Sequence, residues 1–224
     1  MIESQGNGIW TVHQPLKIVG TEIGTRMTII DYTGQGDLMV HSPVRPNDEL
    51  VAEVKKLGTV KHIVAPNRWH HMFVKKFRAH FPEARTYCAP GLEKKRADIN
   101  FDEILENGKT YPWSDSVQHT FVEGSPILNE VIFCHKGSRS LIVTDIGLHI
   151  CEDSPLWTRI AFKAMGAFKK FGWSAPEKWL FIKDKNTFQN SMNEVLKWDF
   201  DQIMLCHGHI VKSNGYEEFK RAFS

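Results

Sequence analysis

The chain contains few cysteines, and no two of them share a short spacing. Cys88, Cys134, Cys151 and Cys206 are far apart and form no Cys-x-x-Cys motif. This spacing argues against a zinc ribbon and against a disulfide framework. A reducing cytoplasm is therefore the expected location.

Long apolar runs, a leader and a strong net charge are also missing. No stretch approaches the ~20 apolar residues of a membrane span, and the start, Met-Ile-Glu-Ser-Gln, lacks the basic and apolar parts of a signal peptide. The net charge of +2 is too balanced to indicate a nucleic-acid partner. With 42% hydrophobic and 24% charged residues, the 224 residues predict one globular domain spanning 1–224. A homodimer is left open.

Strands and helices alternate in the first part of the chain. Apolar runs bounded by turn residues predict strands, and apolar residues at helical spacing predict helices. The expected strands are 26–31, 37–41, 60–65 and 86–89, and the expected helices are 47–58 and 72–80. This alternation indicates a layered α/β fold.

The second part is first rich in strands and then mostly helical. Strands are expected at 117–122, 131–134, 140–144 and 202–206, and helices at 155–171, 187–198 and 216–223. The segment 155–179 contains many aromatic residues among basic ones. We expect this segment to belong to a helical cover, inserted at about 150–200 and packed over the site. The alternative for 155–179 is association with a membrane surface.

Candidate metal ligands follow three of the predicted strands. His70 and His71 follow the strand at 60–65, Asp145 ends the strand at 140–144, and His207 with His209 follow the strand at 202–206. Open α/β layers bring such strand ends to one edge, where ligands bind. Imidazole and carboxylate donors together suit zinc, iron or manganese.

The segment 66–71, Pro-Asn-Arg-Trp-His-His, resembles a degenerate form of the first signature of the metallo-β-lactamase superfamily, His-x-His-x-Asp-His. Pro66 and Arg68 replace the first two histidines. His70 takes the place of the aspartate, and His71 that of the last histidine. The superfamily's middle histidine would fall near Pro126 and is absent.

Two further positions match the superfamily. Asp145 resembles its bridging aspartate, and His207, followed by glycine, resembles its final histidine. The resemblance implies that the ligands of one metal site are lost, whereas the second site keeps His70, His71, Asp145 and His207. We therefore expect one divalent metal ion, with zinc ahead of iron or manganese.

The resemblance covers most of residues 20–224. Segments 40–44, 64–71 and 138–142 look like one branch of the superfamily, a domain group of unknown function. It implies a four-layer αββα sandwich with the metal site at one edge.

A metal-dependent hydrolase follows from this resemblance as the expected activity. The substrate would be a small ester, thioester, lactone or phosphoester, and His70, Asp145 and His209 are the candidate catalytic residues. Two alternatives stay open: a mononuclear iron oxidoreductase on the same fold, and a non-catalytic binding or scaffold protein.

Three other residues are candidates for supporting roles. Asn67 and Glu130 could orient the ligands, although Asn67 after proline is also an ordinary turn residue. Arg68 could hold an anionic substrate or form a simple salt bridge.

Overall fold

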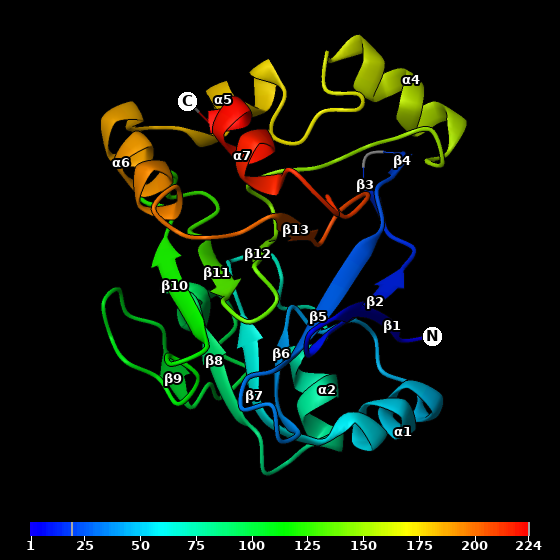
Figure 1. Ribbon diagram of the computed structural model, residues 1–224, viewed down its shortest axis with the longest axis vertical. Coiled ribbons are helices and arrows are strands. Elements are labelled where there is room, and N and C mark those ends of the chain that lie inside the picture. Colours follow the sequence, from blue (N-terminus) through cyan, green and yellow to red (C-terminus); the bar gives the residue numbers. More distant parts are fainter. Residues whose placement is uncertain (19, 224) are drawn as a thin grey trace.

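Two β-sheets lie face to face in the computed structural model, which describes residues 1–18 and 20–223 (Figure 1). The larger sheet has the order β1-β2-β5-β6-β7-β8-β9. Its strands are β1 (Glu3–Gly6), β2 (Ile9–Gln14), β5 (Thr25–Asp31), β6 (Asp37–His41), β7 (Thr59–Ala65), β8 (Arg85–Cys88) and β9 (Glu103–Ile104). Pairing is antiparallel from β1 to β6 and parallel from β6 to β9.

The smaller sheet has the order β10-β11-β12-β13. Its strands are β10 (Val117–Phe121), β11 (Val131–His135), β12 (Ser140–Val143) and β13 (Gln202–Leu205). Only its last pair, β12 and β13, is parallel. A separate hairpin joins β3 (Lys17–Ile18) to β4 (Thr21–Glu22).

Helices cover the outer faces of both sheets. On the larger sheet these are α1 (Asp48–Leu57), α2 (Val74–His80) and α3 (Leu92–Lys95). Beyond the smaller sheet lie α5 (Ala175–Phe181), α6 (Lys185–Val195) and α7 (Gly215–Phe223), with α4 (Leu156–Ala164) at the same end of the molecule (Figure 1). The expected four-layer αββα sandwich is thus confirmed.

Alternation along the central strands divides the core into three apolar layers. Ile63 and Ala65 of β7 pack toward α1 and α2, whereas Val64 packs between the sheets. In β13, Met204 joins the layer between the sheets, and Ile203 joins the layer under α6 and α7. Strands that are apolar on both faces read as continuous apolar runs, which is why they were recognisable in the sequence.

Two helices in the C-terminal half of the chain, α4 and α5, differ from the expected ones. The helix expected at 155–171 ends at Ala164, because Gly166 takes a left-handed φ of 70°. Helix α5 was not expected. A capping box between Ser174 and Glu177 begins it. Among the residues that the structure describes, none of the helices could cross a membrane.

The topology brings three chain segments to one edge of the sandwich. β12 and β13 run parallel, so the segments that follow them emerge at one edge of the smaller sheet. The segment that follows β7 meets them there, since Asn67 Nδ2 donates to Thr144 Oγ1 at 2.9 Å. These segments carry the candidate ligands.

Candidate metal centre

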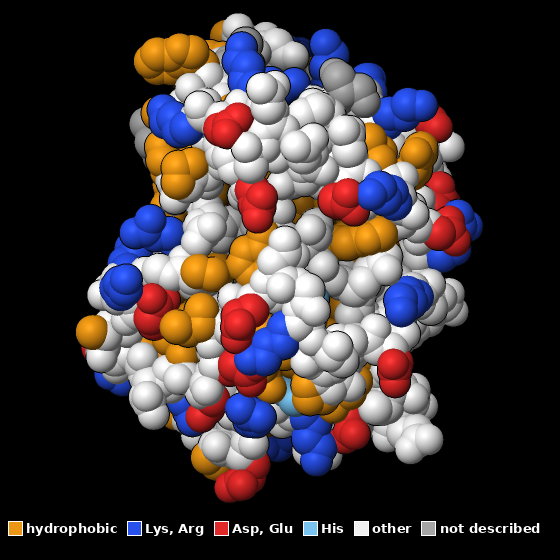
Figure 2. Space-filling view, turned by 90° about the vertical axis from the view of Figure 1, so that its left-hand side faces the viewer, with side chains coloured by type: hydrophobic (Ala, Val, Ile, Leu, Met, Phe, Trp, Pro, Cys, Tyr) orange, Lys and Arg blue, Asp and Glu red, His pale blue; other side chains and the backbone are white. Residues whose placement is uncertain are grey.

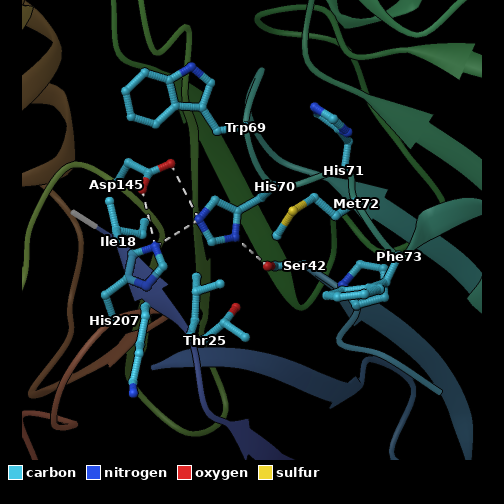
Figure 3. Close-up of a pocket in the computed structure, with 13 residues that line it drawn as sticks. Ile18, Thr25, Ser42, Trp69, His70, His71, Met72, Phe73, Asp145 and His207 are labelled. Carbon is cyan, nitrogen blue, oxygen red and sulfur yellow. Dashed lines mark hydrogen bonds and ion pairs between the residues drawn. The ribbon is translucent and has the colours of Figure 1, made fainter. Parts of the chain in front are cut away.

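His70, Asp145 and His207 converge at this edge (Figure 3). The Nε2 atoms of the two histidines are 3.1 Å apart. Asp145 Oδ2 lies 3.3 Å from His70 Nε2, and Asp145 Oδ1 lies 3.2 Å from His207 Nε2. All three side chains are nearly buried, with 8%, 12% and 3% of their surface exposed in that order.

A backbone carbonyl fixes the ring of His207. Its Nδ1 donates a hydrogen bond of 2.6 Å to the Gly24 carbonyl, which directs Nε2 toward Asp145. The next residue, Gly208, has a φ of +76°, and a Cβ there would stand 2.3 Å from the His149 carbonyl oxygen. Only glycine fits this turn, which explains the His-Gly pair at the end of β13.

Asn67 joins His70 to Asp145. Its Oδ1 accepts from the backbone N–H groups of Trp69 and His70, both at 2.8 Å. Its Nδ2 donates to Asp145 Oδ2 at 2.5 Å. One amide therefore shapes the turn that carries His70 and holds the carboxylate that faces it.

Glu130 holds the loop that carries Asp145. The Glu130 side chain is fully buried and accepts from the backbone N–H groups of Thr144, Asp145 and Ile146, at 2.6, 2.7 and 2.9 Å. Both Asn67 and Glu130 thus lie where an orienting role requires them.

The charges of His70, Asp145 and His207 influence one another. Burial alone would lower the pKa of His70, but the Asp145 carboxylate raises it well above the usual value. The histidines in turn lower the pKa of Asp145 despite its burial. Burial, together with the charge of Asp145, raises the pKa of Glu130 to about 7. The carboxylate of Asp145 therefore stays ionised, and a cation stabilises the cluster.

The donor set fits a transition-metal ion. Because Nδ1 of His207 is bound to the Gly24 carbonyl, Nε2 is the nitrogen that this ring presents to the cluster. Two imidazole nitrogens and a carboxylate form a usual set for zinc or iron. Among the described residues, these three are the one group of histidine, cysteine or acidic side chains close enough to share an ion.

His71 lies outside this group. Its ring points away from the other three residues (Figure 3), and its Nδ1 accepts a hydrogen bond of 2.7 Å from Arg96. Burial, with the charges of Lys95 and Arg96, lowers its pKa to about 4. The structure therefore assembles three of the four expected ligands, because adjacent residues of the turn point in different directions.

The structure does not bring His209 or Arg68 to the cluster either. His209 lines a different pocket, where its Nε2 lies 3.2 Å from Ser154 Oγ. The Arg68 guanidinium reaches the Pro126 carbonyl at 3.5 Å and does not line the pocket above the cluster.

That pocket has a volume of about 320 Å³, and His70, Asp145 and His207 form part of its lining. Its walls are mostly apolar and come from Leu16, Ile18, Pro43, Trp69, Met72 and Phe73. Lys17 adds one positive charge. No residue of the 150–200 segment, expected to pack over the site, belongs to its described lining.

Comparison with known proteins identifies the family. Residues 6–170 match the family described as Domain of unknown function (DUF4336). The chain belongs to this family. No curated protein matches the sequence significantly.

Solved structures of metallo-β-lactamases share the fold of this DUF4336 chain. The enzyme from Pontibacter korlensis is 11% identical, with 98% of each chain covered and a TM-score of 0.65. The enzyme from Hirschia baltica is 12% identical, with 98% of this chain and 97% of that chain covered and a TM-score of 0.62. FIM-1 from Pseudomonas aeruginosa, in a mono-zinc form, is 9% identical, with 99% of this chain and 93% of that chain covered and a TM-score of 0.65.

Sequence reasoning missed two partners of the cluster in this family member. Ser42 Oγ lies 2.7 Å from His70 Nδ1 and fixes the second imidazole. Gly24 supplies the carbonyl that binds His207. Ser42 follows β6 directly and precedes a proline, a strand-end position like those of the ligands. The Gly24 carbonyl belongs to the backbone, so its role cannot be recognised from the type of residue in the sequence.

Proposed function

We propose that this protein is a metal-dependent hydrolase that holds one divalent ion on His70, Asp145 and His207. The observation that carries the proposal is the convergence of three donor groups, 3.1 to 3.3 Å apart, in the lining of a pocket. Buried groups at such separations are stable only with a shared cation or proton. Zinc is the first candidate, and manganese is a further one.

The residues around the cluster support a single ion. Pro66 and Arg68 have no side-chain atom suited to bind a metal cation, and they occupy the places of two histidines in the superfamily signature. His71, the last histidine of that signature, is bound to Arg96. The mono-zinc form of FIM-1 is consistent with one ion on this fold.

A zinc ion in such a site lowers the pKa of bound water from 15.7 toward ~7, which makes hydroxide available at neutral pH. The chain prepares the site for this chemistry. Ser42 and the Gly24 carbonyl hold the two imidazoles by Nδ1, which leaves both Nε2 atoms facing Asp145. Asp145, itself held by Asn67, supplies the negative charge that favours the cation.

The pocket favours a small substrate with an apolar part. Trp69, Met72 and Phe73 would pack against an acyl or alkyl group and exclude water from the reacting bond. An ester, thioester or lactone fits these walls directly. A phosphoester would place its charge near the metal ion and Lys17.

Turnover assays on defined metal forms test the proposal. Protein stripped with a chelator and reloaded with zinc is offered chromogenic esters, thioesters, lactones and phosphodiesters. We expect hydrolysis of at least one class, lost in His207→Ala and kept in His80→Ala, a histidine of α2 outside the site. Zinc-loaded, folded protein that turns over none of these classes would contradict the hydrolase.

The same donor set favours a second candidate, a mononuclear iron oxidoreductase. Two histidines and one carboxylate with open positions are typical of non-haem iron oxygenases. Protein loaded anaerobically with Fe(II) would then bind nitric oxide and give the electron paramagnetic resonance signal of that adduct. Absence of the adduct in iron-loaded protein would dismiss this candidate.

A further inference from the structure

Helix α4 turns an apolar side toward the solvent. Leu156, Trp157 and Ile160 are 64%, 74% and 45% exposed. Positions one and four apart lie on the same half of a helix, so these side chains form one outward surface. A surface helix normally directs such a stripe to the core.

The opposite side of α4 packs against the rest of the domain. Thr158 and Phe162 are its buried residues. Thr158 Oγ1 donates to the Glu22 carbonyl and accepts from the Glu22 N–H, both at 3.0 Å. The outward direction of the apolar stripe is thus fixed by specific bonds to β4.

Helix α5 adds two more apolar side chains, with Trp179 81% and Leu180 46% exposed. Six of the eleven large hydrophobic residues that are exposed in the described chain lie between 156 and 180. Helices α4 and α5 lie at the same end of the molecule, α4 at the upper right and α5 at the upper left of Figure 1. Figure 2, viewed from the left of Figure 1, shows an apolar group projecting at the top beside lysines and arginines. We call residues 155–185 the α4–α5 face.

The α4–α5 face is basic, although one of its charges, that of Lys169, is paired with Glu152. It contains two acidic residues and seven basic ones: Arg159, Lys163, Lys169, Lys170, Lys178, Lys183 and Lys185. The two acids are engaged in helix caps, Glu177 with Ser174 and Asp184 at the start of α6. This excess of positive charge is larger than the +2 of the whole chain, so the remaining residues are net acidic.

We propose that the α4–α5 face docks onto the surface of a membrane that contains anionic lipid. Exposed tryptophans with lysines beside them suit the headgroup region, where the rings enter the interface and the ammonium groups meet anionic lipid. Lys183 lies 5.9 Å from the centre of the Trp179 ring, an example of this arrangement. A second copy of the chain is a poor occupant, because two such faces would repel each other.

Docking would place the mouth of the metal-site pocket beside the bilayer. The ring of Trp69, on the pocket wall, packs against Phe181 of α5 with ring centres 5.7 Å apart. On the other side, Thr158 binds β4, the partner of the β3 strand that carries Ile18 into the pocket wall. This docking depends neither on the metal nor on the proposed activity.

Cosedimentation with vesicles tests the docking. The probes are phosphatidylcholine vesicles with and without about 30% phosphatidylserine, at low and high salt. We expect binding to the anionic vesicles that falls at least roughly tenfold at high salt or without phosphatidylserine.

Exposed positions provide the variants. Trp157→Ala with Trp179→Ala, and separately Lys163→Glu with Lys170→Glu, should each weaken binding roughly tenfold or more without unfolding the chain. Lys56→Glu with Lys76→Glu makes the same charge change on α1 and α2 and should leave binding near that of the parent.

Three results would overturn the docking: no binding to anionic vesicles, equal binding to neutral ones, or binding that both sets of α4–α5 variants leave unchanged. Dimerisation in solution that is lost with the tryptophans would also overturn it, because the face would then be an interface between copies.

Discussion

The Nε2 atoms of His70 and His207 face each other at 3.1 Å, each also close to one oxygen of Asp145. The opposite nitrogen of each ring is held by the protein, His70 by Ser42 and His207 by the Gly24 carbonyl. The lone pairs of two facing imidazole nitrogens repel each other, so a proton or a metal ion must lie between them. In the metal-free protein this is a proton, and the Asp145 carboxylate, which raises the pKa of His70, favours the charged form of that ring.

Metal binding should therefore strengthen as the pH rises. A proton on His70 stabilises the metal-free fold at low pH, and this stabilisation is lost as the pH rises through the raised pKa. Below that pKa the metal displaces one proton, so the affinity for zinc should rise about tenfold per pH unit. Titration of zinc into stripped protein at several pH values measures this. An affinity independent of pH would contradict the shared proton.

Asn67→Asp should destabilise the protein at neutral pH. The substitution replaces the amide that donates to Asp145 with a second carboxylate at the same 2.5 Å contact. We expect a loss of about 1–3 kcal/mol in the free energy of unfolding, partly recovered at acidic pH. Urea unfolding at two pH values checks this, with Asn193→Asp on the exposed side of α6 as the control. Equal losses of stability in Asn67→Asp and Asn193→Asp would contradict a stabilising contact between Asn67 and Asp145.

Glu130→Gln should weaken both the fold and the metal site. An amide nitrogen cannot accept from the backbone N–H groups of residues 144–146, and each N–H left without a partner costs about 1–3 kcal/mol. The loop that carries Asp145 would loosen, lowering zinc affinity about 10–100-fold. Unchanged zinc affinity in the folded variant would argue against this positioning.

The raised pKa of Glu130 also predicts that the stability of the protein depends on pH. Its pKa is raised from 4.5 to about 7, so the folded chain holds this proton more tightly than the unfolded chain. Ionising it costs stability as the pH rises from 4.5 to about 7. Unfolding curves of parent and Glu130→Gln across this range should differ in slope.

Gly208→Ala should disturb the segment that carries His207. Its Cβ would stand 2.3 Å from the His149 carbonyl oxygen at a left-handed φ. Gly34→Ala is the matched control, because Gly34 is also left-handed but has open space around it. We expect the control to lose about 1–2 kcal/mol, and Gly208→Ala to lose more and to bind zinc more weakly. Equal losses of stability in the two variants would contradict the expected clash between the new Cβ at position 208 and the His149 carbonyl oxygen.

The central strands of both sheets were predictable for a physical reason, whereas β1 and β2 at the edge of the larger sheet were not predicted. Strands such as β7 and β13 are apolar on both faces because each lies between two apolar layers. These strands are therefore easy to recognise in the sequence as runs of apolar residues. Helix α5 is short and begins at a capping box after Trp173, with no long periodic pattern to mark it.

The site was predictable only in part. Strand ends identified His70, Asp145 and His207 as candidates, because parallel strands deliver their carboxyl ends to one edge. The direction of His71 depends on the turn that Asn67 shapes and on Arg96, 25 positions away. Neither contact is visible in the local sequence.

Metal content of the purified protein, of His207→Ala and of His71→Ala tests the three-residue site most directly. Elemental analysis of folded protein prepared without chelator or polyhistidine tag is the measurement. We predict about one zinc, iron or manganese ion per chain in the parent and in His71→Ala, and none in His207→Ala. The absence of metal from the parent even after reloading, or the presence of two ions per chain, would contradict the three-residue site. Loss of metal from His71→Ala would show that His71 is a fourth ligand.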